Sequence, residues 1–116
     1  MVRDISEAVQ SALIAARNAG QKVRGTTSPN PAVGCAVFDA NGIIATGGTE
    51  PPGGRHAERV ALDQAASINP ERLKGASLAV TLEPCNHTGR TGPCAEAIVA
   101  AGIAHVYYCL LYTSPS

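Results

Sequence analysis

The sequence lacks any apolar run that approaches the roughly 20 residues needed to cross a bilayer. Its first ten residues, MVRDISEAVQ, also lack the apolar core of a signal peptide. Nine basic and nine acidic residues cancel, so the chain has no excess positive charge for a nucleic-acid backbone. We therefore expect a cytoplasmic protein with no membrane partner and no nucleic-acid partner.

Internal repeats, low-complexity tracts and domain linkers are missing as well, and 116 residues correspond to one small domain or part of one. The sequence has only four cysteines. In a cytoplasmic chain, thiols near other ligand types indicate a metal site or catalysis more often than disulfides. We expect a single domain over residues 1–116 with reduced cysteines.

Hydrophobic spacing predicts helices that alternate with strands. The expected elements are a helix over 4–20, a hairpin of two strands over 35–48, a helix over 56–67, a strand over 76–82, a helix over 93–102 and a strand over 105–111. The dipeptide Asn41-Gly42 favours a tight hairpin turn. Strands that alternate with helices pair in parallel, so the order αββαβαβ predicts an α/β fold in which helices cover a sheet.

Three potential metal ligands lie at or near predicted helix starts. His56 opens the second predicted helix, Cys94 lies at the start of the third, and Cys85 lies in the loop before it. Sheets of this type gather loops and helix starts at the carboxyl ends of their strands, where ligands usually bind. One imidazole and two thiolates suit Zn²⁺, which takes nitrogen and sulfur ligands. The sequence therefore predicts zinc held by these three residues.

A carboxylate lies beside these ligands. Glu58 follows His56 by two residues, close enough to reach a water on the metal without being a ligand. Three protein ligands leave one tetrahedral position open, which is typical of a catalytic zinc, and the carboxylate can pass a proton from water to a leaving group. His-x-Glu with Pro-Cys-x-x-Cys is typical of zinc nucleobase deaminases, although here eight residues separate Cys85 and Cys94.

Each part of this pattern has a simpler interpretation when taken alone. A His-x-Glu triplet occurs by chance on surfaces, and two cysteines nine positions apart can be small buried residues or a disulfide. The combination with a Pro-Cys pair in a Gly-bearing loop and a second Pro-Cys pair at a helix start is far more specific. Cys35 and Cys109 lie in apolar strand runs, and we expect both to be core residues.

The stretches SPNPAVGCAV, GGTEPPGGRHAE and TLEPCNHTGRTGPCAEAI resemble the pyrimidine deaminase domain of riboflavin biosynthesis, diaminohydroxyphosphoribosylaminopyrimidine deaminase, over residues 4–108. This family belongs to the cytidine/deoxycytidylate deaminase-like zinc superfamily. The long loop from Pro84 to Cys94 separates it from cytidine, guanine and tRNA-adenosine deaminases, whose cysteines are closely spaced. Two departures are Gly92, where the family commonly has proline, and Thr49, where many members have histidine.

The resemblance implies a three-layer α/β/α fold with a mixed sheet. It also implies a zinc-dependent hydrolytic deamination, in which water replaces a ring amine of a phosphoribosylamino-pyrimidine. The residues it assigns are His56, Cys85 and Cys94 to the metal, Glu58 to catalysis, and Asn30, His87 and Arg90 to the substrate. Asn30 would contact the ring, whereas His87 and Arg90 would meet the phosphate and ribose, where a cation is needed.

Alternatives stay open at this point. Asn30 can also be a turn residue before Pro31, Arg90 a solvated surface charge and His87 a fourth zinc ligand. With four protein ligands the chain would be a structural zinc module, and with too little sheet it would be a catalytically silent fragment.

The end of the chain departs from the family. Residues 109–116, CLLYTSPS, replace a segment of the Asp-Pro-Asn-Pro type, and the further helix, strand and helix of the fold are missing. We therefore expect a domain truncated at its C-terminus, whose uncovered last strand favours self-association into a homo-oligomer. The resemblance also implies a reductase domain that uses NADPH, either fused or as a partner, for which this chain is too short.

Overall fold

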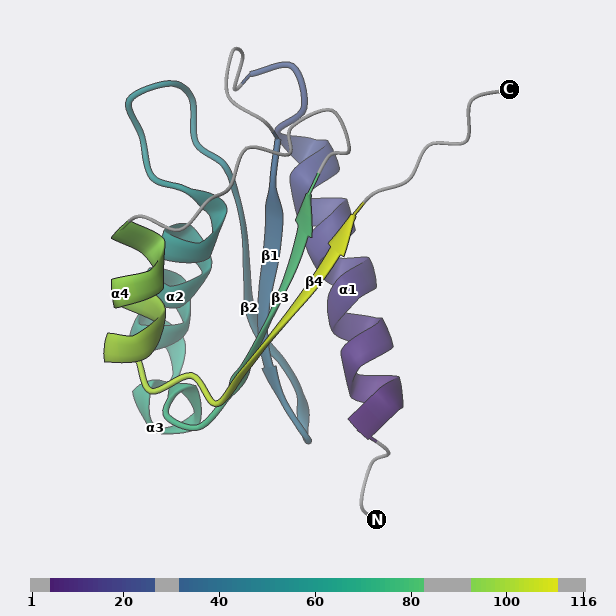
Figure 1. Cartoon of the computed structure of the whole chain (residues 1–116), viewed down its shortest axis with the longest axis vertical. Helices are drawn as coiled ribbons and strands as arrows, with labels where there is room; N and C mark the ends of the chain where they lie inside the picture. Colours follow the sequence, from purple (N-terminus) through teal and green to yellow (C-terminus); the bar gives the residue numbers. More distant parts are fainter. Residues whose placement is uncertain (1–4, 27–31, 83–92, 111–116) are drawn as a thin grey trace.

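The computed structural model describes residues 5–26, 32–82 and 93–110 (Figure 1). Its elements are α1 (Ile5–Lys22), β1 (Gly34–Asp39), β2 (Gly42–Gly48), α2 (Ala57–Ile68), α3 (Pro70–Leu73), β3 (Ser77–Leu82), α4 (Pro93–Ala100) and β4 (His105–Leu110). The strands form a mixed sheet in the order β2-β1-β3-β4. Helix α1 covers one face of the sheet, and α2, α3 and α4 cover the other (Figure 1), which confirms the predicted three-layer α/β fold.

The strand directions decide where helix starts meet. β1 is antiparallel to β2 and to β3, whereas β3 and β4 are parallel. The hairpin of β1 and β2 ends on the pair Asp39 and Gly42, at the predicted turn. Helix α4 lies in the crossover between the parallel strands, as such a pair requires. β3 and β4 therefore end at the same edge of the sheet, and α2 and α4 both begin there (Figure 1).

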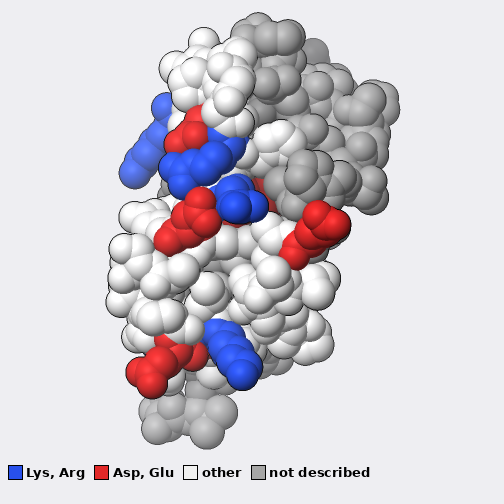
Figure 2. All heavy atoms as spheres, turned by 90° about the vertical axis from the view of Figure 1, so that its left-hand side faces the viewer, with Lys and Arg blue, Asp and Glu red and all other residues white. Residues whose placement is uncertain are grey.

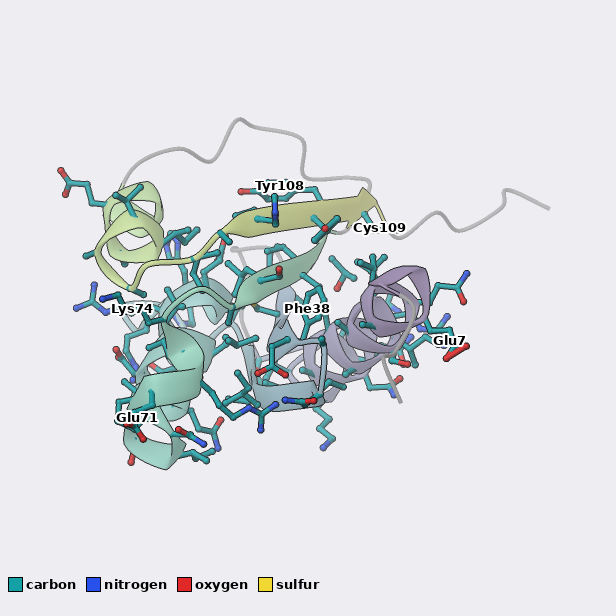
Figure 3. All side chains as sticks on the ribbon, turned by 90° about the horizontal axis from the view of Figure 1, so that it is seen from below. Glu7, Phe38, Glu71, Lys74, Tyr108 and Cys109 are labelled. Carbon is teal, nitrogen blue, oxygen red and sulfur yellow. The ribbon has the colours of Figure 1, made fainter. Side chains whose placement is uncertain are left out.

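The core has two layers, one on each face of the sheet, because successive side chains along a strand point to opposite faces. Val37 and Leu78 belong to the layer under α2, α3 and α4. Ala36 and Phe38 belong to the layer under α1, and Figure 3 shows Phe38 between the sheet and that helix. The ring centroids of Phe38 and Tyr107 lie 6.0 Å apart, so this contact fills the α1 layer near the outer strand.

Glycines in the strands let the helices lie directly on the sheet. A Cβ atom at Gly34 of β1 would lie 1.6 Å from the carbonyl oxygen of Ala16 in α1. A Cβ atom at Gly47 of β2 would lie 2.7 Å from the backbone nitrogen of Ala61 in α2. Both distances are far below van der Waals contact, so these two positions fix how closely α1 and α2 approach the sheet.

A substitution at Gly34 tests this packing. We expect Gly34→Ala to lower the free energy of unfolding by about 3 kcal/mol, at the upper end of overpacking costs, because the added methyl group meets backbone rather than a side chain that can move. For comparison, Gly25 has φ 92° and open space around its Cβ position. Gly25→Ala should cost only backbone strain, about 1 kcal/mol. Urea unfolding measures both; equal small losses would show that α1 does not rest on β1.

The short helix α3 is absent from the sequence prediction. Asn69 precedes it, and its side-chain oxygen accepts a hydrogen bond of 3.2 Å from the backbone nitrogen of Arg72. Pro70 occupies the first helical position, where its fixed φ and missing N–H suit a helix start. The Arg72 guanidinium also donates to both carboxylate oxygens of Asp39, at 2.8 and 2.7 Å. This ion pair holds α3 against the β1–β2 hairpin and lowers the pKa of Asp39.

The prediction for the two remaining cysteines is half correct. Cys35 is buried in β1, as expected, whereas Cys109 is exposed on β4. Cys109 is exposed because β4 is the outer strand of the described sheet. Side chains on an outer strand have a neighbouring strand on one side only. Tyr108 on the same strand is also exposed, and Figure 3 shows both side chains there. None of the helices in the described ranges is long and apolar enough to cross a membrane.

Candidate functional site

The candidate site lies at the N-terminal end of α2. His56 is the N-cap of this helix in an extended conformation, with φ −73° and ψ 159°, and its carbonyl oxygen accepts a hydrogen bond of 3.0 Å from the Val60 nitrogen. Ser, Thr, Asp and Asn are preferred at an N-cap because their side chains cap the first turn. The His56 imidazole forms no such capping bond. Capping of the helix therefore does not account for a histidine at this position, and the metal-ligand role of His56 stays a prediction from the sequence.

Glu58 lies in the first turn of the same helix and is 7% exposed. Of the described residues that are buried, it is the one with a charged side chain. The helix N-terminus favours a negative charge, but Glu is almost never buried without a partner, because burial of a carboxylate costs free energy. A buried glutamate two residues after His56 is therefore a candidate for chemistry rather than for packing.

Cys94 lies at the start of α4, as the sequence predicted. It is the second residue of that helix, after Pro93. Helices α2 and α4 contact one another and begin at the same end of the sheet, where β3 ends (Figure 1). The partial positive charge of a helix N-terminus favours a thiolate over a thiol. The fold therefore brings the helix starts that carry His56 and Cys94 to the same edge of the sheet.

The other predicted site residues lie outside the described residues. They are Cys85, His87 and Arg90 in the segment 83–92, and Asn30 in the segment 27–31. For Cys94 the structure describes the position in α4 and not the side chain. The metal-ligand set and the substrate-binding residues therefore stay predictions.

Thr49 has a role that the sequence did not indicate. Its side chain is buried, and its Oγ1 accepts from the Val33 nitrogen at 3.0 Å and donates to the Val33 carbonyl oxygen at 3.3 Å. The Thr49 backbone nitrogen donates to the same oxygen at 3.1 Å. These bonds fasten the chain just after β2 to the residue just before β1. They give the Thr49 hydroxyl a structural role at this position.

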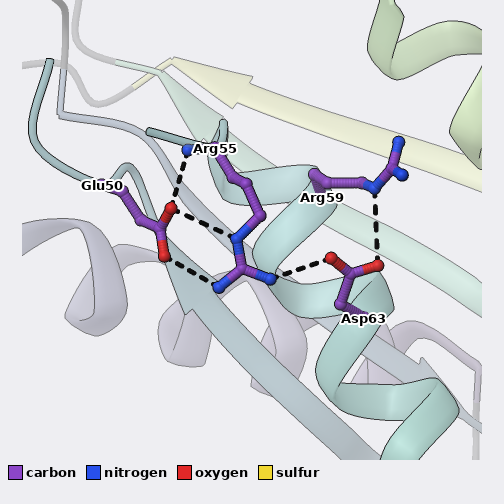
Figure 4. A network of polar contacts seen from close by, with 4 residues as sticks. All are labelled: Glu50, Arg55, Arg59 and Asp63. Carbon is purple, nitrogen blue, oxygen red and sulfur yellow. Dashed lines mark hydrogen bonds and ion pairs between the residues drawn. The ribbon is translucent and has the colours of Figure 1, made fainter. Parts of the chain in front are cut away.

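A network of four charged residues lies next to His56 and was also missed (Figure 4). The Arg55 guanidinium donates to Glu50 through Nε and Nη2, at 3.2 and 2.8 Å, and to Asp63 through Nη1 at 2.8 Å. Arg59 pairs with Asp63 at 3.4 Å. The side-chain hydrogen bonds from Arg55 lower the pKa of Glu50 to about 2, so Glu50 is ionised at neutral pH.

The surface on the side of α2 and α4 carries charges of both signs. Figure 2 shows Lys and Arg side chains next to Asp and Glu side chains on this face, in agreement with the ion pairs of Arg55 and Arg59 with Glu50 and Asp63. Two cations and two anions cancel, so this network adds no net charge beside the site.

Comparison with known proteins identifies the family. Residues 6–110 match the family model of the cytidine and deoxycytidylate deaminase zinc-binding region. The chain therefore belongs to this family of zinc-dependent deaminases, and Zn²⁺ is its implied cofactor. This result confirms the fold class, the enzyme class and the cofactor that the sequence predicts.

Within this family the chain is similar to proteins of riboflavin biosynthesis. It is 49% identical over 113 residues to riboflavin biosynthesis protein RibD of Corynebacterium ammoniagenes, which covers 97% of this chain and 32% of the relative. It is 43% identical over 90 residues to the diaminohydroxyphosphoribosylamino-pyrimidine deaminase of Buchnera aphidicola subsp. Schizaphis graminum, covering 78% of this chain and 58% of the relative. The chain spans about a third of the length of the first of these relatives.

Solved structures agree with the sequence comparison. A diaminohydroxyphosphoribosylaminopyrimidine deaminase/5-amino-6-(5-phosphoribosylamino)uracil reductase from Thermotoga maritima has a TM-score of 0.75 and 39% identity, over 90% of this chain and 30% of that chain. A cytidine deaminase from Burkholderia pseudomallei has a TM-score of 0.68 at 21% identity, over 90% of this chain and 87% of that chain, and shows the shared fold alone. The resemblance to the riboflavin-biosynthesis deaminases is thereby confirmed.

Proposed function

We propose that this chain is a deaminase domain, over residues 1–116, that hydrolyses a ring amine of a diaminohydroxyphosphoribosylaminopyrimidine in riboflavin biosynthesis. The observation that carries the proposal is the pairing of His56 at the N-cap of α2 with buried Glu58 two residues later in the first turn, beside the start of α4. The relatives in riboflavin biosynthesis support the choice of substrate.

The donor types at this end of the sheet fit zinc. His56 would supply an imidazole nitrogen from the start of α2, Cys94 a thiolate from the start of α4, and Cys85 a second thiolate from the segment that joins β3 to α4. One nitrogen and two sulfurs form a set that Zn²⁺ prefers, and three protein ligands leave one position open for water or substrate. Zinc held there would supply the Lewis acidity that lets a water lose its proton near neutral pH.

Glu58 would move the proton in this reaction. Its carboxylate accepts a proton from the attacking water and delivers it to the departing ring amine. A C–O bond forms at the ring carbon while the C–N bond breaks, and ammonia leaves, so no oxidant or reductant is needed. Because Glu58 is buried, it is shielded from bulk solvent as the proton moves.

The substrate-binding residues follow from the resemblance and stay part of the proposal. Asn30 would bond the edge of the pyrimidine ring, while His87 and Arg90 would contact the ribose and the phosphate. The bonds of Thr49 to Val33 support this arrangement, because they fix the backbone of Val33, which lies three residues after Asn30.

A substrate panel tests the proposed activity. Ammonia release is measured from zinc-loaded protein with the phosphoribosylamino-pyrimidine, its dephosphorylated form, cytidine and deoxycytidylate. We expect the first compound to have by far the highest kcat/KM. Equal or better turnover of cytidine or deoxycytidylate would contradict the substrate, although not the family.

Arg90→Ala should selectively lower kcat/KM for the phosphorylated substrate. A hydrogen bond to a charged group contributes about 1.5–3 kcal/mol, so we expect kcat/KM for the phosphorylated pyrimidine to fall by roughly 10- to 100-fold. The dephosphorylated analogue is the control, and its kcat/KM should change little. Equal losses for both compounds would show that Arg90 supports the loop and does not contact phosphate.

The relatives also suggest what acts next. The Thermotoga maritima relative is named as both a deaminase and a reductase, and we infer that a reductase that uses NADPH, fused or separate, consumes the product of this domain. Within the described residues β4 is the outer strand of the sheet, and this supports the expectation of a homo-oligomer, because the edge of an outer strand can pair with another chain.

A further inference from the structure

The segment 50–55, between β2 and α2, is closed by its first and last residues. The Glu50 backbone nitrogen donates to the Arg55 carbonyl oxygen at 3.0 Å, and the Arg55 backbone nitrogen donates to Glu50 Oε1 at 2.7 Å. The guanidinium adds two bonds to the same carboxylate (Figure 4). Backbone and side chain therefore fix Arg55 relative to the end of β2.

Two glycines make this closed segment sterically feasible. Gly53 has φ 91°, a conformation that side chains rarely adopt. The Gly54 nitrogen donates to the Pro51 carbonyl oxygen at 2.8 Å. A Cβ atom at Gly54 would lie 2.6 Å from Glu50 Cβ and 2.9 Å from Glu50 Oε1, so any larger residue would displace the carboxylate that Arg55 holds.

Arg55 also joins this segment to α2. Its Nη1 donates to Asp63 Oδ2 at 2.8 Å, and Arg59 of the same helix pairs with the other Asp63 oxygen. The residue after Arg55 is His56, and Glu58 follows within the first turn. The backbone that presents the predicted metal ligand and the predicted catalytic carboxylate is therefore held from the strand side and from the helix side at once.

We propose that Glu50, Arg55 and Asp63 are positioning residues, which set the backbone from which His56 and Glu58 enter the active site. This proposal rests on the proposed function, because it takes His56 as a zinc ligand and Glu58 as the proton carrier. A guanidinium can serve two carboxylates from three nitrogens, whereas the ammonium of lysine is a single point. The role therefore requires arginine.

Global stability is a poor explanation for the network. The side chains of Arg55, Glu50 and Asp63 are 47%, 33% and 45% exposed, and exposed ion pairs contribute little to the free energy of unfolding. The balanced charge of the network also leaves no net cation for a phosphate. Its position directly before His56 is what distinguishes it from an ordinary surface ion pair.

Zinc affinity, measured by competition with a chelator, tests the proposal. We expect Arg55→Gln to weaken zinc binding by about 10-fold or more, as loss of groups that orient metal ligands typically does, with little change in thermal unfolding. Arg55→Lys should not restore the affinity. Arg59→Gln is the matched control: it removes the same charge from the same network without touching the 50–55 segment, and it should bind zinc like the wild type.

Gly54→Ala provides a second test that changes no charge. It displaces the Glu50 carboxylate, so zinc affinity should fall as it does in Arg55→Gln. In both variants, without zinc, hydrogen exchange of the amides over 56–60 should be faster than in the wild type. Wild-type zinc affinity and wild-type exchange in Arg55→Gln would overturn the proposal, and so would an equal loss in Arg59→Gln.

Ammonia release from the same samples separates this proposal from the proposed reaction. The wild type could bind zinc but release no ammonia, while Arg55→Gln still lowers the zinc affinity and accelerates hydrogen exchange. In that case the proposed reaction is wrong and the positioning role stands. If the wild type is active and Arg55→Gln matches it in zinc affinity, exchange and kcat, the reaction stands and the positioning role is wrong.

Discussion

Glu58→Gln should lower kcat by about 10²–10⁴-fold, the usual contribution of a general acid–base group, while the protein keeps its zinc. Glutamine has nearly the same shape as glutamate, so the buried position at the start of α2 stays filled. It cannot accept the proton of the attacking water, however, and this is the step assigned to Glu58. Ammonia release under saturating substrate, together with metal analysis of the same sample, measures both effects.

The matched control is Glu71→Gln. Glu71 is an exposed glutamate in the first turn of α3. Helix α3 lies on the same side of the sheet as α2 and α4 but at the opposite end from where these two helices begin (Figure 1). This variant should have wild-type kcat and zinc content. A Glu58→Gln protein that releases ammonia at the wild-type rate would show that another group moves the proton.

Replacing His56, Cys85 and Cys94 together by alanine should abolish zinc binding. The variant loses the single imidazole and both thiolates of the predicted set. Without these protein ligands the zinc ion is no longer bound. Metal analysis after exhaustive dialysis is the measurement. Retention of one zinc per chain would place the ligands elsewhere.

Two substitutions on the outer strand are the control for this loss. His105 and Cys109 supply the same ligand types from β4, and His105→Ala/Cys109→Ala should keep full zinc. His87→Ala then distinguishes a catalytic site from a structural one. Three protein ligands predict that this variant keeps its zinc, whereas a marked loss would indicate a fourth ligand and a closed structural site.

Most of the fold follows from local sequence patterns. Asn41-Gly42 predicts the hairpin turn that the structure shows between β1 and β2, and the alternation of strands and helices predicts the parallel pair of β3 and β4. Helix α3 spans only Pro70–Leu73, which is too short for hydrophobic periodicity to reveal. Cys109 sits in an apolar run, but exposure depends on being in the outermost strand, and strand order is a tertiary property.

The candidate site also contains residues that local sequence predicts and residues whose roles depend on the tertiary fold. His56 and Glu58 are recognisable because two chemically demanding residue types lie two positions apart, at a predicted helix start. The roles of Thr49 and Arg55 depend on distances across the fold: Thr49 bonds Val33, sixteen positions away, and Arg55 joins two carboxylates from different elements. No spacing in the sequence specifies such contacts, so they emerge only from the folded chain.

Isotope transfer from water tests the central claim most directly. Zinc-loaded protein is incubated with the phosphoribosylamino-pyrimidine in ¹⁸O-labelled water, and the product and the ammonia are measured together. Hydrolytic deamination predicts one labelled oxygen in the pyrimidine ring product for each ammonia released, and it predicts loss of both signals in Glu58→Gln. An unchanged substrate, or ammonia without label in the ring product, would contradict the account of this chain as a hydrolytic pyrimidine deaminase.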